Sequence, residues 1–484
     1  MKKSFLVNVF TALALCFLAV IYGAASVHLG WWPSSIIADA KNAAAALLSV
    51  QEEELRRNWP TSMEQIEESD YQSLAVINYA PALERDDDLI FVDGGTHQLR
   101  AHCPDNGCIA WVMDKAGTIR HVWDIGSELI WENASHIKGF SRAENIYSVG
   151  AHPFPNGDLL VVYQGRNTYP YGVGIAKFDK DSNLLWLKGN YAHHWLSVDQ
   201  DGYIYVSAFN ALQAPVQLGA SNLKINCNSG VLQEDVILVL DADGNEVERI
   251  SILQALADSG YLGVVFQGVH SDLPLPLNYS ECDPTHLNDV RVISMEDAAT
   301  SPYLSAGDLL VSLRSNNTVM VISRETKKVT WVSVGRTALQ HSPRYMGDNT
   351  LLVFDNLGGK ADEGGSRLLR LDMDTDAVDV IYPPQSSNQS VSEAKNYDVL
   401  SATGGQISLS DDRSRALISL TRQGRTLEID LASGKLLWEF LNIHDVSGIL
   451  EGDQGSAEVY GRFATQTVTY FNEADFPFNE GRLH

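Results

Sequence analysis

The feature that most constrains the fold of this chain is a short motif that recurs along it. Each copy is a strand ending in Asp or Ser, a short polar turn, and a second strand that often carries Trp. Turn residues between two apolar half-strands are typical of β-hairpins. Self-similarity at intervals of roughly 50–80 residues is typical of propeller blades. Six copies can be read, at residues 113–123, 178–187, 240–250, 322–332, 371–381 and 429–440.

Apolar runs before most of these hairpins indicate further strands for the same blades. They lie at residues 157–164, 202–209, 307–314, 349–356 and 414–421. The first blade is short of one strand, and we expect residues 462–472 to supply it and close the ring. Such closure hides the sheet edges that otherwise invite aggregation. The sequence therefore predicts an all-β fold, a six-bladed β-propeller that occupies residues 88–484.

The N-terminus carries a separate signal. Lys2 and Lys3 precede an apolar run over residues 5–25 that is close to the length that spans a bilayer. Residues 24–26 would also suit a signal-peptide cleavage site. We favour an uncleaved membrane anchor over residues 1–30, and both alternatives predict that the rest of the chain is exported.

The segment over residues 31–87 is expected to link this anchor to the propeller. Residues 40–57 are rich in Ala, Leu and Glu, which predicts a helix. Asp39 is placed to cap it, and residues 58–60 (NWP) are expected to end it. The remainder is mixed and acidic, so we expect a helical and acidic linker.

Four cysteines lie outside the apolar run, an even number that fits disulfide bonding after export. They are Cys103, Cys108, Cys227 and Cys282. Cys103 and Cys108 flank a tight turn, which favours a local disulfide and leaves the other two to pair across a longer loop. Three connectivities are open, and free buried cysteines are the alternative.

The charge balance limits the class of partner. The chain has 61 Asp and Glu against 35 Lys and Arg, a formal net charge of −26. A general nucleic-acid partner is excluded because the phosphate backbone demands a cationic protein surface. The hydrophobic fraction of 45% is that of a globular protein and excludes wholesale disorder.

Histidines gather where the innermost strand of each blade is expected to begin, facing the central channel. Converging imidazoles suit metal ligation, anion binding or nucleophilic and acid–base catalysis. Arg314 would add a bidentate cation for an oxyanion, which favours an anion site, although Asp283 and Asp289 near His286 leave a metal open. The alternative is that each histidine only hydrogen-bonds backbone. The expected strand starts carry His152, His193 with His194, His286, His341 and, in the last blade, Gly404-Gly405-Gln406.

Several of these runs together resemble those of bacterial arylsulfotransferases. The resemblance covers roughly residues 88–472, in order. The runs that carry it are HHWLSVDQDGYIYV (193–206), THLNDV (285–290), VSLRSNNTVMVISRETKKVTWV (311–332), QHSPRYMGDNTLLVFDN (340–356) and residues 404–440.

The resemblance implies a function and assigns roles. Members of this family are six-bladed propellers that move a sulfuryl group from a phenolic sulfate ester to a phenol through a sulfated histidine. They need no nucleotide sulfate donor, and we expect no cofactor and no metal in this chain. Matched by motif, His341 would be the nucleophile, and His194, His286 and Arg314 would bind the sulfate oxygens. The residues expected to assist in substrate binding are His193, Asn288, Arg344 and His152.

Two departures from that family leave questions open. Long insertions at residues 210–235 and 255–283 are expected to reshape the channel mouth and with it the choice of donor and acceptor. Characterised soluble members carry a β-rich N-terminal domain used in dimerisation, whereas this N-terminus predicts a helix and an anchor, so the oligomeric state is open. The resemblance to a bacterial family places the anchor in the inner membrane, as a single pass, with the propeller in the periplasm.

Two other function classes compete with the sulfotransferase. A quinoprotein-type dehydrogenase shares the hairpin pattern and would hold a quinone and usually Ca²⁺, but it calls for eight blades. A non-catalytic, membrane-anchored propeller used as a scaffold or ligand-binding module would tolerate loss of the axial histidines.

Overall fold

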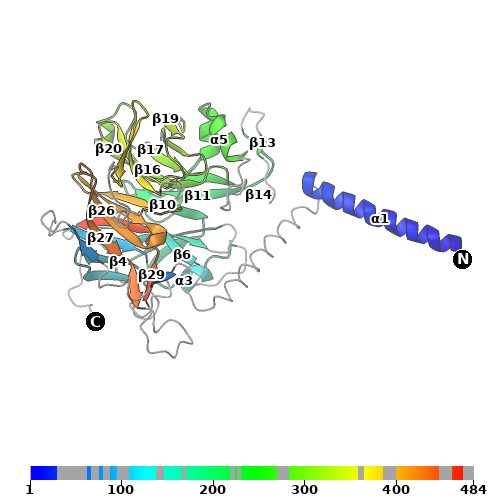
Figure 1. Ribbon diagram of the computed structural model, residues 1–484, viewed down its shortest axis with the longest axis horizontal. Helices are drawn as coiled ribbons and strands as arrows, with labels where there is room; N and C mark the ends of the chain where they lie inside the picture. Colours follow the sequence, from blue (N-terminus) through cyan, green and yellow to red (C-terminus); the bar gives the residue numbers. More distant parts are fainter. Residues whose placement is uncertain are drawn as a thin grey trace.

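We analysed a computed structural model of the chain (Figure 1). The structure describes residues 2–29, 63–66, 76–79, 88–94, 108–137, 146–165, 171–218, 224–225, 231–269, 283–357, 365–384, 399–445 and 460–472.

Most described strands form six antiparallel sheets, the blades of a β-propeller, as the hairpin repeat predicts. The first three blades consist of β30 (Thr467–Asn472), β3 (Asp88–Asp93), β4 (Cys108–Asp114) and β5 (Ile119–Asp124); of β6 (Ile146–Pro153), β7 (Leu159–Gly165), β8 (Gly172–Phe178) and β9 (Leu184–Lys188); and of β10 (Ala192–Val198), β11 (Ile204–Gln213), β14 (Val231–Leu240) and β15 (Glu246–Ser251).

The other three blades follow in chain order, each from its innermost strand outward. They consist of β16 (Leu287–Val292), β17 (Leu309–Leu313), β18 (Thr318–Ile322) and β19 (Val329–Val334); of β20 (His341–Gly347), β21 (Thr350–Asp355), β22 (Arg367–Asp372) and β23 (Val378–Tyr382); and of β24 (Gln406–Leu409), β25 (Arg415–Leu420), β26 (Arg425–Asp430) and β27 (Lys435–Leu441).

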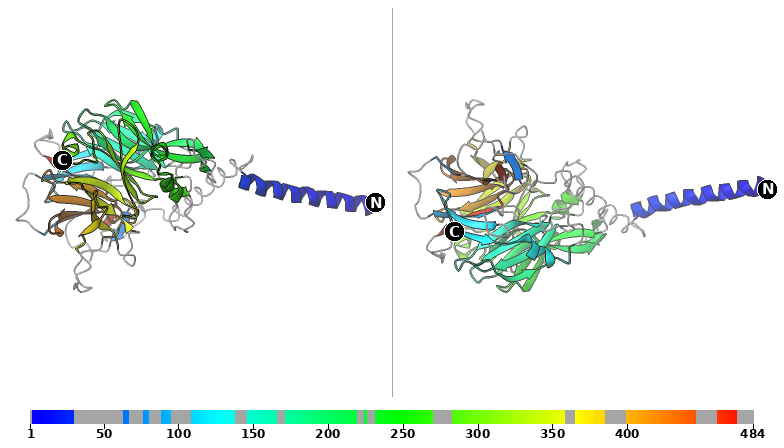
Figure 2. Two further views of the ribbon diagram at one scale, coloured as in Figure 1. Left: turned by 90° about the horizontal axis from the view of Figure 1, so that it is seen from above. Right: turned by 90° about the horizontal axis from the view of Figure 1, so that it is seen from below.

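The C-terminal strand closes the ring. β30 pairs with β3 in register from Asp88↔Asn472 to Asp93↔Thr467, so it is the innermost strand of the first blade. This confirms the expectation that residues 462–472 complete that blade. Figure 2 shows the N-terminal strands, in blue and cyan, beside the C-terminal strands in orange and red. Pairing the two ends of the propeller leaves neither end as an open sheet edge.

The recurrent Asp at the end of most first hairpin strands has a local cause. The Asp179 carboxylate accepts hydrogen bonds from the backbone N–H groups of Asp181 and Asn183, at 2.9 and 2.8 Å. Asp241 accepts from Asp243 and Asn245 in the same way, at 3.0 and 2.8 Å. These bonds satisfy the amides of the tight turn, which is why Asp favours such positions.

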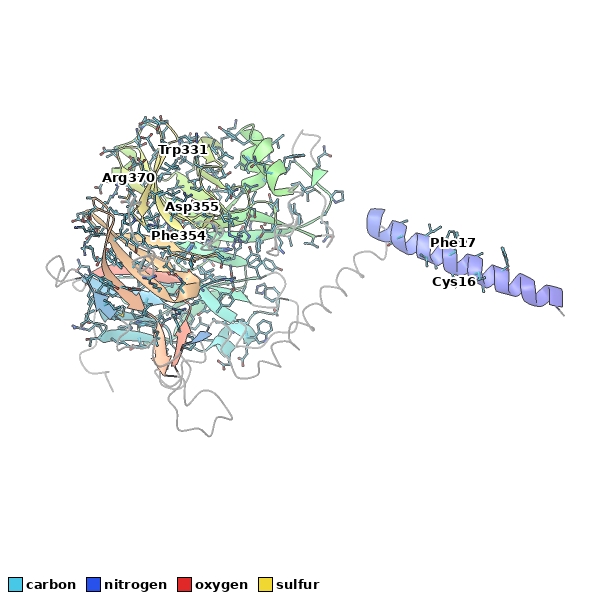
Figure 3. The ribbon with its side chains drawn as sticks, in the orientation of Figure 1. Cys16, Phe17, Trp331, Phe354, Asp355 and Arg370 are labelled. Carbon is cyan, nitrogen blue, oxygen red and sulfur yellow. The ribbon has the colours of Figure 1, made fainter. Side chains whose placement is uncertain are left out.

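The recurrent Trp joins four of the blades to the next one. Its indole N–H donates to a backbone carbonyl in a turn of the following blade, and Trp331 is labelled in Figure 3. Because Trp buries a large apolar area and still has a polar atom to satisfy, it suits a contact between sheets. The four bonds are Trp123 to Gly157 at 3.1 Å, Trp186 to Ala242 at 3.2 Å, Trp331 to Met373 at 3.0 Å, and Trp438 to Lys115 at 2.9 Å.

Two hairpins lack Trp, and charged residues join their blades instead. In the third blade, Glu248 pairs with Arg324 and Lys327 of the fourth. In the fifth, the Arg370 guanidinium donates to the Leu431 carbonyl of the sixth, at 3.5 Å. The hairpin motif is thus also the interface between neighbouring blades.

Shorter elements decorate the propeller. Two strands from the predicted linker pair with strands from the end of the chain: β1 (Met63–Ile66) with β29 (Tyr460–Phe463), and β2 (Val76–Asn78) with β27. The predicted helix over residues 40–57 lies outside the described residues. The remaining elements are β12 (Val216–Gln217), β13 (Lys224–Ile225), β28 (Ile443–Asp445), η8 (Thr421–Gln423), and the helices α3 (Ser127–Glu132), α4 (Ile252–Asp258), α5 (Leu262–Val269) and α6 (Met295–Ala298).

The N-terminal apolar run forms a helix, α1 (Lys2–Leu29). Its described side chains are largely exposed, Phe10 at 78% and Phe17 at 65%. Within the described part of the chain, no helix has the length and apolar character needed to cross a membrane. The predicted membrane anchor therefore has no support in the structure.

The cysteine expectation stays a prediction. Cys103, Cys227 and Cys282 lie outside the described residues, and nothing is described of the Cys108 side chain at the start of β4. Cys16 on α1 is a free, exposed thiol (Figure 3).

The blade interfaces generate a stability prediction. Trp123→Ala removes a fully buried indole and its bond to Gly157, so we expect a loss of about 3–5 kcal/mol in the free energy of unfolding. Trp186→Ala removes the same kind of bond at a half-buried site, so its cost should be clearly smaller. Denaturant unfolding of both variants checks this, and equal losses would contradict burial as the source of the stability.

Candidate functional site

The candidate site lies where three neighbouring inner strands begin. β10, β16 and β20 each carry a β-bulge near their first residues. Backbone there is left-handed at His194 (φ 55°), His286 (φ 51°) and Ser342 (φ 57°). Non-glycine residues adopt this conformation at a cost of about 1–3 kcal/mol each, and both bulges and such strain concentrate at functional sites. The irregular backbone thus presents histidines from adjacent blades at one end of the central channel.

A buried glutamine fixes the position of His341, the first residue of β20. The Gln340 amide donates to Ser312 Oγ and to the Leu313 and Thr318 carbonyls, at 3.0–3.1 Å. Its side-chain oxygen accepts from the Thr337 hydroxyl at 2.9 Å. All its polar atoms are therefore used to tie the start of β20 to the fourth blade.

The Asn356 side chain fixes the tautomer of His341. Its amide nitrogen donates to the Ser401 and Gly404 carbonyls, at 2.7 and 2.8 Å. Its oxygen is therefore the atom that faces His341 Nδ1, at 2.7 Å. The Leu339 carbonyl lies 3.1 Å from the same nitrogen. Because both neighbours are acceptors, Nδ1 carries the proton, and the lone pair of the neutral ring lies on Nε2.

His341 is held in its neutral form. Burial, and then the positive charge of Arg314, lower its pKa from 6.5 to about 3. The side chain is only 2% exposed. Near neutral pH the ring therefore offers an uncharged nitrogen lone pair, which is the form required of a nucleophile.

The glycine pair at the start of the last blade packs against this arrangement. Gly405 adopts φ 115°, and a Cβ atom there would lie 2.3 Å from Phe354 Cδ1. Phe354 is the cross-strand partner of His341 and is labelled in Figure 3. Glycine is required here because any side chain would displace Phe354 of β21, the strand that pairs with β20 at the candidate nucleophile.

His194 is also neutral but has the opposite tautomer. Its Nδ1 lies 2.6 Å from His193 Nδ1 and 3.4 Å from the Gln164 amide nitrogen. That nitrogen is a donor, and the Gln164 oxygen accepts from the Tyr147 hydroxyl at 3.2 Å. With Nδ1 accepting, the proton lies on Nε2, which is then a hydrogen-bond donor. Burial, followed by the charges of His193, His286, His341 and Arg314, puts its pKa well below the usual value.

His193 lies behind His194 and contacts protein on all sides. It is fully buried, stacks on Phe209 with ring centroids 4.0 Å apart, and places Nε2 3.5 Å from the Asp235 carboxylate. It packs edge-on against His194, with ring centroids 4.9 Å apart, and its role in substrate binding stays a prediction.

His286 has a carboxylate partner. Its Nδ1 lies 2.6 Å from Asp283 Oδ2, and its backbone N–H donates to Asp283 Oδ1 at 3.2 Å. Burial raises the pKa of Asp283, but the interaction with His286 outweighs burial and lowers it. Tyr171 packs against the rings of His193, His194 and His286. Its hydroxyl lies 3.4 Å from Asp283 Oδ2.

Four of the predicted residues come together here: His194, His286, Arg314 and His341. The His194 and His286 ring centroids are 4.9 Å apart. Arg314 is 4% exposed, its backbone N–H bonds the His286 carbonyl at 3.0 Å, and its charge acts on both His194 and His341. A buried cation surrounded by imidazoles is suited to an oxyanion. Asp283 pairs with His286, whereas Asp289 points to arginines, so the two acids flagged for a metal do not converge.

Two other predicted residues have structural contacts. Asn288 donates to the Gln340 carbonyl at 2.8 Å and so positions the residue before His341. Arg344 donates to Asp289 at 3.1 Å and to the Ile407 carbonyl at 2.9 Å, and Arg291 binds the other Asp289 oxygen at 3.0 Å. This ion-paired group links the fourth, fifth and sixth blades farther along the inner strands.

His152 does not occupy the predicted position. β6 begins at Ile146, so His152 lies near the end of its strand and not at the start. Burial and the nearby Arg291 lower its pKa to about 4, which places it with the arginine group at the other end of the channel. The apolar run that follows His152 forms β7, the second strand of the blade, so His152 precedes that strand and does not begin the innermost one.

Sequence reasoning missed Asn356 and Tyr171, and noted Asp283 only as a metal ligand. Asn356 closes the run LLVFDN, and its spacing of 15 residues from His341 spans one hairpin, which was the available signal. Tyr171 precedes β8 in the second blade, and nothing in its local sequence indicates a site.

The buried neutral histidines predict a loss of stability in acid. Because the His341 pKa is lower in the folded chain than in the unfolded chain, folding excludes a proton. The contribution of this group to the free energy of unfolding is fully present above about pH 6.5. It falls by roughly 1.4 kcal/mol per pH unit as the pH drops toward about 3. His341→Gln should flatten the plot of unfolding free energy against pH by about that slope between pH 6 and pH 4, roughly the range in which proton exclusion acts. An unchanged slope would contradict a neutral, buried His341.

The solved structures that align with this chain have low sequence identity and low structural similarity to it. A protein of unknown function from Bacteroides caccae has 10% identity and a TM-score of 0.43, covering 80% of this chain and 100% of that one. A virginiamycin B lyase from Staphylococcus aureus has 9% identity and a TM-score of 0.32, covering 60% and 69%. At these scores neither supports an inference about this chain. No curated protein matches the sequence significantly.

The sequence profile of one protein family does match. The profile described as arylsulfotransferase (ASST) aligns with residues 151–443, which is more than half of the chain. The matched segment contains every predicted site residue, from His152 to Arg344, as well as Asn356 and Asp283. The chain therefore belongs to the arylsulfotransferase family.

Proposed function

We propose that this protein transfers a sulfuryl group from a phenolic sulfate ester to a phenol by way of a sulfated His341. Family membership supports arylsulfotransferase activity in general. The observation that carries the histidine mechanism is the bond from His341 Nδ1 to Asn356 Oδ1, because it directs the ring's lone pair to Nε2. No hydrogen bond to that Nε2 occurs among the described residues.

The first step is a substitution at sulfur. His341 Nε2 donates its lone pair to form an N–S bond, and the S–O bond to the aryl group breaks with its electron pair remaining on the phenolic oxygen. The ring keeps its Nδ1 proton and gains positive charge. Asn356 Oδ1 and the Leu339 carbonyl both accept from that N–H, and they stabilise the charge as it develops.

The transition state also places charge on the three sulfuryl oxygens. Arg314 supplies a buried guanidinium, and His194 supplies an Nε2–H donor. In a site shielded from water such donors act more strongly than they would in solvent. The second step reverses the first, with an acceptor phenol attacking sulfur and the electron pair of the N–S bond returning to His341.

Trapping the intermediate tests this proposal. Wild-type protein incubated with 4-nitrophenyl sulfate and no acceptor should release nitrophenol in a burst of about one equivalent. Mass spectrometry of the quenched protein should find one sulfuryl group on the peptide that contains His341. His341→Gln should abolish both signals.

A matched histidine serves as the control for that substitution. His121 is another largely buried histidine, in β5 of the first blade and away from the site, so His121→Gln should retain the burst and the label. Wild-type rates in His341→Gln, or a sulfuryl group on another residue, would overturn the proposal.

The tautomer argument predicts a large effect from a residue that does not touch the substrate. Asn356→Ala removes the acceptor of His341 Nδ1, so the imidazole is no longer held in one orientation and one tautomer. We expect kcat to fall by roughly 10²-fold with little change in KM. Asn442 is a buried asparagine whose amide also donates to two carbonyls, of Gly94 and Ala464. Asn442→Ala should lower stability and leave kcat near the wild-type value. Similar kcat values for the two variants would refute a role for Asn356 in setting the tautomer.

A further inference from the structure

The three imidazoles of the site differ in what holds their second nitrogen. His341 Nδ1 faces an amide oxygen, and His194 Nδ1 faces the Gln164 amide nitrogen, a donor. His286 Nδ1 faces the Asp283 carboxylate at 2.6 Å. A carboxylate is the one partner of the three that stabilises a positively charged ring. The three rings are therefore prepared for different tasks.

We propose that Asp283 and His286 form the proton-transfer dyad of the site. His286 Nε2 donates a proton to the departing phenolic oxygen and takes the proton of the acceptor phenol, and Asp283 is its positioning residue. This assignment rests on the sulfuryl transfer proposed above and replaces the expectation that His286 only binds sulfate oxygens.

The geometry holds the dyad rigidly. Asp283 contacts His286 twice, through the ring and through the backbone N–H, so the carboxylate sets both the ring and the left-handed turn that carries it. The side chains of the pair are 11% and 19% exposed. His286 is thus more open than His341, which is 2% exposed. A group that exchanges protons with the substrate and with solvent requires that access.

The other titratable groups around His286 suit the role less well. The ring centroids of Tyr171 and His286 are 6.1 Å apart. Burial and the Asp283 charge keep the pKa of Tyr171 well above 10, so its hydroxyl holds its proton. His194 and His341 are neutral, and Arg314 stays protonated at any pH of interest. The second acid–histidine contact, between Asp235 and His193, is fully buried and longer at 3.5 Å.

The proton balance of the two steps closes on this dyad. When the S–O bond breaks, the phenolic oxygen takes the proton from His286 Nε2, and His286 is left neutral with its Nδ1–H on Asp283. When the acceptor phenol attacks the sulfuryl group on His341, its proton moves to His286 Nε2. The ring ends each full cycle as it began, so no further reactant is needed.

Leaving-group dependence tests the dyad. 4-Nitrophenol is a much stronger acid than phenol, so 4-nitrophenyl sulfate departs without a proton and phenyl sulfate needs one. In Asp283→Asn and His286→Gln, the single-turnover rate with phenyl sulfate should fall by roughly 10²–10⁴-fold. The rate with 4-nitrophenyl sulfate should fall by only a few fold, and sulfation of His341 should persist.

A buried aspartate elsewhere in the same blade gives the matched control. Asp308 is 4% exposed and accepts backbone N–H bonds from Ser305 and Arg324, at 3.0 and 3.1 Å. Asp308→Asn should leave the ratio of the two donor rates unchanged even if stability falls. A change in that ratio equal to the change in Asp283→Asn would overturn the proposal.

The outcomes separate this inference from the proposal beneath it. Equal slowing with both donors in the dyad variants would assign His286 to sulfate binding and overturn the dyad alone. Absence of phenol release from both donors with the wild-type protein would overturn the sulfotransferase and the dyad together.

Discussion

The hydrogen bond between Asn356 and His341 is the interaction on which the rest of the account depends. Asn356 uses both amide protons on the carbonyls of the last blade, so its oxygen must face the imidazole. One neutral tautomer of His341 follows, with the lone pair on the nitrogen opposite. The partners of the other two rings differ: His194 Nδ1 lies beside the Gln164 amide nitrogen, and His286 Nδ1 lies beside the Asp283 carboxylate. Three chemically identical side chains thus acquire three functions from their neighbours.

The propeller supplies this chemistry with a rigid frame. Trp123, Trp186, Trp331 and Trp438 link successive blades through indole–carbonyl bonds, and charged side chains make the contact where Trp is missing. β30 closes the ring with the first blade. Bulges lie at the starts of β10, β16 and β20. They turn toward the channel side chains that a regular strand would direct elsewhere. A strongly acidic protein can in this way hold a buried cation, Arg314, beside neutral imidazoles.

Much of the fold was predictable because hairpins are local. The Asp that satisfies its own turn and the Trp that contacts the next blade recur in the sequence, so six blades and their closure followed from periodicity. The site was predictable in part: His194, His286, Arg314 and His341 do come together. His152 was misplaced because an apolar run does not reveal which strand of a blade is innermost. Tyr171 and the orientation of Asn356 depend on contacts between blades, which no local pattern records.

Two-substrate kinetics can show whether a covalent sulfuryl intermediate forms on His341. Initial rates would be measured over a grid of aryl sulfate and phenol concentrations and plotted in double-reciprocal form. Transfer through His341 separates the two half-reactions by release of the first phenol, so we expect a family of parallel lines. Lines that intersect would show that donor and acceptor bind together and that the sulfuryl group passes directly between them, which would exclude the intermediate.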